Sequence, residues 1–343
     1  MKIFYWKSEE PNFGDDLNAW FWQELLGDAI GSDDNVLFVG IGSVLGGDLS
    51  NAERTVVLGA GAGYSPLPEE FNGPTWTIYG VRGPLTAAFC GLDDSKVLAD
   101  PAILMPRVFP RNETSDGKVR FVPHYHSAMR APWHRICAKA GIELLDPRQN
   151  SKNVVSKIAA SSLVLAESLH AAIVADAFRV PWIPSWSSKE ICSFKWHDWA
   201  MAVGAHVEPK WLPAPSPLSQ LDDFMAPFAA NDNAGFPDPL ATEQSGGLDC
   251  AVGRMRLDLA RRQGAWSKFR RRNYLRLRTR VAMPLLRMVG GGWAEALEDR
   301  AAEALSRLAG SEGTLSDPVL FQQAEARLDE VIRKLKEDRR AAL

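Results

Sequence analysis

A histidine and two cationic side chains follow predicted β-strands of this 343-residue chain. His170 comes after the apolar run at 162–166, Arg82 follows the run that begins at 75, and Lys189 follows the next apolar run after His170. The carboxyl ends of parallel strands lie at one edge of a sheet, where open α/β proteins bind their ligands. Imidazole donates a proton near neutral pH, and arginine or lysine binds carboxylate or phosphate. Each residue alone has an ordinary structural explanation, but together they predict an anionic substrate and a proton donor.

Two polar motifs also fall at the edges of predicted strands. "LADPAIL" at 98–104 puts Asp100 where it either orients a basic group or makes a turn. "NFGDDLN" at 12–18 suits the start of a helix, because Asn and Asp cap helices and complement the helix dipole. The same side chains suit sugar hydroxyls, so this motif is a candidate acceptor site made of Asn12, Gly14, Asp15 and Asp16.

Glycine-rich turns follow two of the predicted strands, "GIGSVLGG" at 40–47 and "GAGAGY" at 59–64. Glycine lets backbone N–H groups approach an anion, but a P-loop is excluded because the Gly-Lys-Ser/Thr ending is missing. The spacing does not fit the dinucleotide fingerprint either. "HYH" at 124–126 is a weak metal motif, and a loop at a strand end explains it better. We therefore expect no metal and no bound cofactor.

Bulk composition indicates a globular protein with no character that would draw it to nucleic acid. Hydrophobic residues make up 46% of the chain, and the formal net charge is -3. The four cysteines form no CxxC pair, which fits a reducing compartment. The first residues do not resemble a signal peptide, and no apolar run reaches ~18 residues. These features predict a cytoplasmic location.

Short apolar runs alternate with helical patterns along the first two hundred residues, which predicts an α/β fold with doubly wound parallel sheets. The runs lie at 2–6, 35–42, 54–61, 75–83, 96–101, 118–126, 142–146, 162–168 and 180–184, and the helical patterns at 15–27, 84–90, 128–140, 151–160 and 170–178. A Pro-rich polar stretch at 105–118 reads as a linker. We expect domains at 1–108 and 109–228, then a mobile loop and a basic helical extension at 229–343.

The chain resembles the polysaccharide pyruvyl transferase family, in particular members that place pyruvate ketals on bacterial exopolysaccharides. The matching pieces, spread over about residues 1–200, are "NFGDDLN", "VRGPLT", "LADPAIL", "AESLHAAIVADAFRVP" and the lysine of "SSKE". The resemblance implies two Rossmann-like domains arranged as in GT-B glycosyltransferases. It also implies phosphoenolpyruvate as donor and a lipid-linked or polymeric glycan as acceptor, with the N-terminal domain on the acceptor side and the second domain on the donor side.

The resemblance assigns donor binding and catalysis to Arg82, His170 and Lys189. Many members have an arginine two residues before the histidine, where this chain has Ser168 with Glu167 beside it. Either another base, Lys195 or Arg179, holds the donor there, or Glu167 tunes the histidine. We therefore include Ser168 and Glu167 among the donor-binding residues. The alternative functions are a nucleotide-sugar glycosyltransferase of the same architecture and a non-catalytic scaffold for glycan assembly.

The arginine-rich tail has two interpretations. Aromatic and leucine side chains are interleaved with arginines between 254 and 280, which suits an amphipathic helix on an anionic membrane surface. Such contact would make the enzyme peripheral on the inner face of the cytoplasmic membrane. The alternative is a solvated helix that pairs with acidic side chains of this protein or of a second subunit.

Overall fold

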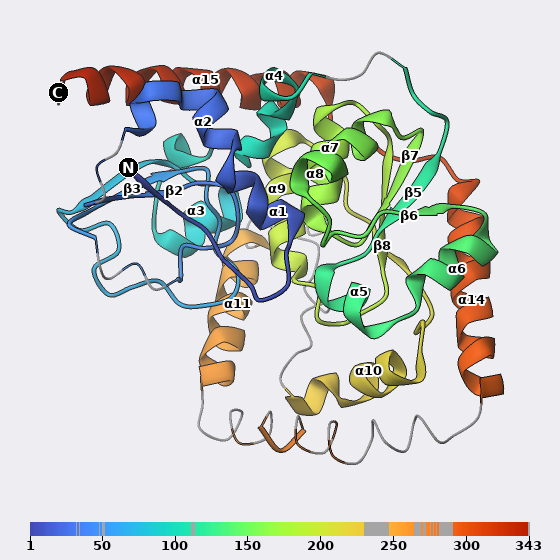
Figure 1. Cartoon of the computed structure of the whole chain (residues 1–343). Helices are drawn as coiled ribbons and strands as arrows, with labels where there is room; N and C mark the ends of the chain where they lie inside the picture. The colour runs from blue at the N-terminus through green and yellow to red at the C-terminus, as the bar shows by residue number, and fades with distance from the viewer. Residues whose placement is uncertain are drawn as a thin grey trace.

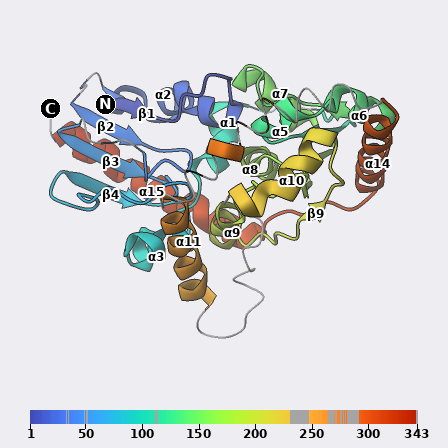
Figure 2. The ribbon, with the colours of Figure 1, turned by 90° about the horizontal axis from the view of Figure 1, so that it is seen from below.

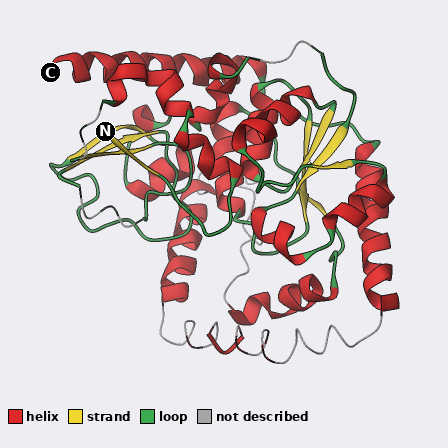
Figure 3. Cartoon of the chain, viewed as in Figure 1, coloured by secondary structure: helices red, strands yellow, loops and turns green. Residues whose placement is uncertain are grey.

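Two parallel β-sheets, with helices between and around them, form the framework of the chain (Figure 1; Figure 3). This architecture comes from a computed structural model. The structure describes the whole chain except residues 32, 34, 48, 50, 51, 111–113, 230–246, 264–268, 270, 271, 275, 277, 279, 281–290, 342 and 343.

The first sheet has its four strands side by side in chain order. They are β1 (Lys2–Phe4), β2 (Val36–Val39), β3 (Arg54–Leu58) and β4 (Trp76–Gly80). The middle of this sheet is buried on both faces, because all four residues of β2 are apolar and covered. Helices α1 (Phe13–Asp16) and α2 (Phe21–Leu26) follow β1, and α3 (Pro84–Cys90) follows β4.

The second sheet has the order β6-β5-β7-β8-β9, so the chain reverses its direction of winding between β5 and β7. Such a reversal leaves a crevice at the carboxyl ends of the two strands, which is the usual ligand position. The strands are β5 (Val119–Val122), β6 (Glu143–Leu144), β7 (Leu163–Ala166), β8 (Trp182–Trp186) and β9 (Lys210–Trp211). The accompanying helices are α5 (Tyr125–Arg130), α6 (Trp133–Ala140), α7 (Ser151–Ala160), α8 (Leu169–Ala177) and α9 (Ser193–Val203).

The predicted α/β class is confirmed, and two predicted helices, 84–90 and 151–160, coincide with α3 and α7. Two details of the prediction are wrong. The run at 96–101 forms no strand, because Val97 makes only an isolated bridge to Val81 before the short turns η3 (Asp94–Lys96) and η4 (Pro101–Leu104). The first sheet is not doubly wound, since its four described strands run in chain order without a reversal.

The predicted linker at 105–118 begins as a short helix, α4 (Met105–Val108). One continuous apolar core includes Phe38 of the first sheet and Val164 of the second. The two halves therefore share buried surface, and the GT-B-like division at 108/109 stays a prediction.

The C-terminal extension packs on both halves of the molecule (Figure 2). It follows α10 (Pro217–Ala229) and includes α11 (Gly247–Gln263), α14 (Gly291–Ala309) and α15 (Pro318–Ala341). Helix α14 lies on α6, and α15 buries Phe321, Leu328 and Leu335 in the shared core. Most of the predicted loop at 229–247 lies outside the described residues. Within the described part of the chain, no helix is long and apolar enough to cross a bilayer.

Candidate functional site

His170 lies in the first turn of α8, immediately beyond the carboxyl end of β7. Its side chain is 14% exposed, and its Nε2 atom is 3.8 Å from Oδ2 of Asp100. On the other side of the ring is Gly14 of α1, where a Cβ atom would lie only 2.1 Å from Nδ1. Any side chain at position 14 would collide with the imidazole. A motif from the start of the chain and one from its middle thus meet at the predicted histidine.

Asp100 is the buried acid of this site. It precedes η4, and its Oδ1 atom accepts a hydrogen bond from the Ala102 N–H at 3.0 Å. Its Oδ2 atom, which faces His170, is buried and has no hydrogen-bond partner among the described residues. Burial raises the pKa of Asp100 to about 6, although the positive charge of Arg82 opposes the rise. A buried carboxylate oxygen without a partner is costly to keep, so it points to a role beyond folding.

Arg82 is held in the wall of the site and is 1% exposed. Its Nε atom donates to Asp198 Oδ2 at 2.9 Å and its Nη1 atom to Ser43 Oγ at 2.6 Å. The third bond runs from Nη2 to the carbonyl of Ala62 at 3.1 Å. The guanidinium is therefore fixed, and its charge acts on both His170 and Asp100. Direct contact between Arg82 and a donor stays a prediction.

Lys195 of α9 is the lysine that the fold brings to His170. Its Nζ atom lies 4.5 Å from the ring centre of Tyr64 and donates to the Tyr64 hydroxyl. Its charge acts on His170, on Asp15 and on His124. The side chain is only partly buried. Sequence reasoning named this lysine only as a substitute for the missing arginine.

The other two predicted bases lie elsewhere. The backbone N–H of Lys189 is 3.4 Å from Asp223 of α10, and the Lys189 charge acts on that carboxylate. The part of Lys189 in an anion clamp stays a prediction. Arg179 donates to the hydroxyl and the carbonyl of Ser316, at 2.8 and 2.9 Å, and so anchors the segment that leads into α15.

The electrostatic field of the site disfavours the charged form of its histidines. Burial lowers the pKa of His170 to about 3, and the charges of Lys195 and Arg82 add to the effect. The pKa of His124, at the end of β5, is lowered well below its usual range by burial and by Lys195. With no ligand bound, both imidazoles are neutral at physiological pH.

Glu167 and Ser168 hold the strand ends around the site together through hydrogen bonds. The Glu167 carboxylate accepts the Ser187 N–H and the His124 N–H, both at 2.8 Å, and thereby joins the ends of β5, β7 and β8. Ser168 is the N-cap residue of α8, and its N–H donates to the carbonyl of Val122 at 3.2 Å. Both are buried, so their predicted contact with the donor stays untested.

The predicted acceptor motif reaches the site through α1. Asn12 donates to Asp15 Oδ2 at 2.7 Å, and burial raises the pKa of Asp15 to about 6 despite that bond. Burial also raises the pKa of Asp16. Because the backbone of Gly14 lies against the His170 ring, α1 brings this motif to the histidine, and its contact with an acceptor stays a prediction.

His124 is the site residue that sequence reasoning missed. The motif "HYH" directly after a predicted strand was its only signal, and it was interpreted as a loop. The reversal of winding between β5 and β7, which gives the position its meaning, is not visible in the sequence. In the described part of the chain, no three His, Cys, Asp or Glu side chains gather as metal ligands.

Two parallel α/β sheets thus bring a buried guanidinium, a lysine and an imidazole beside a buried acid to one region of the molecule, the kind of place where α/β proteins bind ligands. The chain belongs to the polysaccharide pyruvyl transferase family, whose sequence pattern matches residues 12–188. It is also 43% identical over 216 residues to the succinoglycan biosynthesis protein ExoV of Rhizobium meliloti (strain 1021), a match that covers 62% of this chain and 68% of that protein. The protein is therefore an enzyme of the class that transfers pyruvate to polysaccharide. The family match includes Gly14, Asp100 and His170.

Proposed function

We propose that the enzyme transfers pyruvate from phosphoenolpyruvate to a sugar of an exopolysaccharide, or of its lipid-linked precursor, and forms a pyruvate ketal. The observation that carries this proposal is the meeting of His170 with Asp100, Lys195 and Arg82. Membership of the family and the similarity to a succinoglycan biosynthesis protein support the same substrate class.

The chemistry requires two additions at C2 of the enolpyruvate. Protonation of C3 makes C2 an electrophile, one sugar hydroxyl adds, phosphate leaves and a second hydroxyl closes the ring. Of the two hydroxyl protons released, one balances the proton given to C3 and the other leaves with phosphate. A positioned general acid is therefore needed, and His170 takes that role.

The donor's carboxylate and phosphate need fixed positive charge. Lys195 supplies a partly exposed ammonium group that reaches them directly, while the buried Arg82 adds its field from the wall. Lys189, one loop away, completes the clamp when it turns from Asp223 toward the donor. The acceptor sugar lies along Asn12, Asp15 and Asp16, whose oxygens bind its hydroxyl groups.

Incubation of the full chain with phosphoenolpyruvate and a lipid-linked oligosaccharide tests the function. We expect release of inorganic phosphate together with a pyruvate ketal in the glycan, detected by mass spectrometry. Transfer from a nucleotide sugar instead would replace this function with that of a glycosyltransferase. Turnover of neither donor would contradict both of these functions.

We also place the enzyme in the cytoplasm, against the inner face of the membrane, through residues 254–280. In support, Leu257 of α11 is 59% exposed and the Arg261 side chain is 73% exposed. Further along, Tyr274 and Arg278 bind Asp222 of α10, so this part of the segment is tied to the protein itself. Its remaining arginines are what an anionic surface would attract.

Co-sedimentation with vesicles tests this contact on the full chain, because removal of the extension would strip α15 from the core. We expect binding to vesicles that contain anionic phosphatidylglycerol and loss of binding in an Arg261→Glu, Leu257→Ser variant. Equal partitioning into neutral and anionic vesicles would contradict the membrane contact.

A further inference from the structure

The proposed reaction needs a protonated His170 as general acid, but the site without donor favours the neutral imidazole. Asp100 Oδ2 is buried and has no hydrogen-bond partner in the described part of the chain, and it lies 3.8 Å from His170 Nε2, which is longer than a hydrogen bond. A protonated His170 would give this oxygen the partner that it lacks. The two side chains are therefore placed so that protonation of His170 would create an ion pair with Asp100.

Burial is the main reason that this proton is absent, and the charges around His170 add to its effect. Lys195 approaches from α9 and Arg82 from the end of β4, and both act on the imidazole, whereas Asp100 is the only acid that faces it within the described residues. Helix α1 presents only the backbone of Gly14 to the ring. On α8 itself, the carboxylate of Asp176 is occupied by Trp182 and Ser316. Burial and the charges of Lys195 and Arg82 together outweigh Asp100, although Arg82 is itself paired with Asp198.

A bound phosphoenolpyruvate would reverse this balance. Its carboxylate and phosphate carry two to three negative charges, which neutralise the same two cations that disfavour the imidazolium. Asp100 then becomes the dominant charge at Nε2, and a proton on His170 is stabilised by an ion pair in a buried setting. By linkage, a group whose protonation is favoured only in the complex must take up its proton when the ligand binds.

We propose that Asp100 is a positioning residue: when phosphoenolpyruvate binds, His170 takes up a proton from the solvent, and Asp100 holds the resulting imidazolium through Nε2. The imidazolium formed in this way is the general acid that protonates C3. The inference rests on the proposed function and adds to it the order of events. Donor binding comes first, protonation of His170 follows, and transfer of that proton to the donor comes last.

Calorimetry of phosphoenolpyruvate binding to the full chain at pH 7.5, without acceptor, tests the inference. Titration in buffers of different ionisation enthalpy gives the number of protons taken up. We expect the wild type to take up about one proton more than His170→Gln, which corrects for protons exchanged by the ligand itself. Asp100→Asn should lose most of that uptake. Asp176→Asn, at an equally buried carboxylate outside the site, should retain it.

The pH profile of turnover gives an independent readout. Loss of the Asp100 charge lowers the pKa of the imidazolium in the complex, so the pH at which activity falls should shift downward in Asp100→Asn. If that variant does not fold, Asp100→Ser keeps a cap for the Ala102 N–H and removes the same charge.

The outcomes separate the two proposals. Binding of phosphoenolpyruvate with equal proton uptake in the wild type and His170→Gln would overturn the inference and leave the function intact. Full uptake with an unshifted profile in both Asp100 variants would remove Asp100 from it. No binding of phosphoenolpyruvate at all would overturn the proposed function and the inference together.

Discussion

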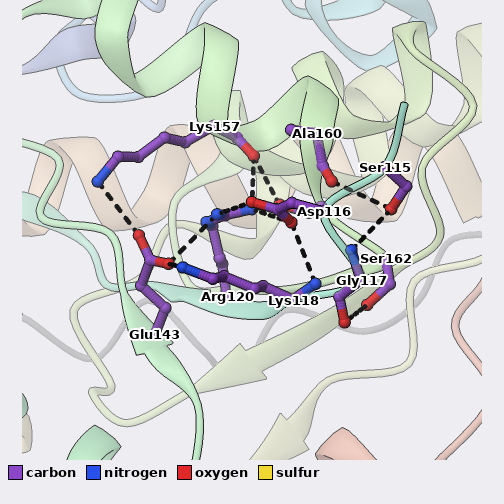
Figure 4. A network of polar contacts seen from close by, with 10 residues as sticks. Ser115, Asp116, Gly117, Lys118, Arg120, Glu143, Lys157, Ala160 and Ser162 are labelled. Atoms are coloured by element: carbon purple, nitrogen blue, oxygen red, sulfur yellow. Dashed lines mark hydrogen bonds and ion pairs between the residues drawn. The ribbon is translucent and has the colours of Figure 1, made fainter. Parts of the chain in front are cut away.

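Acidic side chains are fully paired at one end of the second sheet and incompletely paired at the other. At the amino end, Arg120 donates to Asp116 and Glu143, and Lys157 donates to Glu143 at 3.1 Å (Figure 4). At the carboxyl end, one oxygen of Asp100 has no hydrogen-bond partner among the described residues, and it lies beside His170, whose pKa burial lowers to about 3. The same sheet thus carries one network whose acids are all paired and one that is left incomplete.

The pKa directions express this contrast. Burial raises the pKa of Glu143, but hydrogen bonds from Lys118, Lys157 and Arg120 outweigh it and lower the value to about 2. At the other end burial dominates, and the pKa values of Asp100 and Asp15 rise to about 6. Carboxylates that are paired with cations stabilise the fold. Carboxylates whose pKa is raised by burial and that lack such pairing mark sites where a ligand can bind.

The largest expected difference between the two ends is in catalysis. His170→Ala should leave a folded protein with turnover reduced by ~10²–10⁴, because a positioned general acid is lost. His134→Ala, at an exposed histidine on α6, is the matched control and should retain full activity. Initial rates of phosphate release measure both. Wild-type turnover in a folded His170→Ala variant would remove this residue from the mechanism.

The cations of the site give the next largest effect. Lys195→Ala should weaken donor binding by roughly 10–100-fold, because a hydrogen bond to a charged group is worth about 1.5–3 kcal/mol. Lys189→Ala should have the smaller effect, because Lys189 starts beside Asp223 rather than beside His170. The KM for phosphoenolpyruvate of each variant distinguishes the two lysines. A larger increase for Lys189→Ala would mean that the loop after β8 closes on the donor.

Sequence reasoning singled out several of the residues that the structure brings together, but it did not predict how they are arranged. Local signals, a strand end followed by a helix start, were enough to single out His170 and Arg82, because both follow a strand and precede a helix or stand at its start. Asp100 was singled out by the same signal, although the run before it forms no strand. The choice between Lys189 and Lys195 depended on how α9 lies against the first half of the chain. No local pattern carries that information.

The same limit applies to the fold. Helix α7 was predicted to the residue because Asn150 caps it and Ser161 follows its end. The short edge strand β9 was missed, since two exposed residues leave no hydrophobic pattern. The order of the strands, and with it the reversal beside His124, is a property of tertiary packing.

Neutralising an acidic side chain should change the free energy of unfolding in opposite directions at the two ends of the second sheet. Asp15→Asn removes a carboxylate whose pKa is raised from 3.8 to about 6, so at pH 8 it should stabilise the protein by about 1–3 kcal/mol. The gain should shrink as the pH falls through 6 toward 4, where Asp15 takes up a proton in the folded wild type. Thermal unfolding across this pH range measures it. A lower melting temperature for Asp15→Asn at pH 8 would show that Asp15 stabilises the fold after all.

Glu143→Gln should give the smallest effect and the reverse sign. The pKa of Glu143 is lowered from 4.5 to about 2, so its charge stabilises the fold above pH 4.5, and that contribution is lost as the pH falls toward 2. Because the side chain is 25% exposed, solvent screening reduces the loss in the variant to about 1 kcal/mol at pH 7. Turnover should remain at the wild-type level, since Glu143 lies at the opposite end of the sheet from His170. A variant with unchanged stability but impaired turnover would contradict the division of the sheet into a structural end and a functional end.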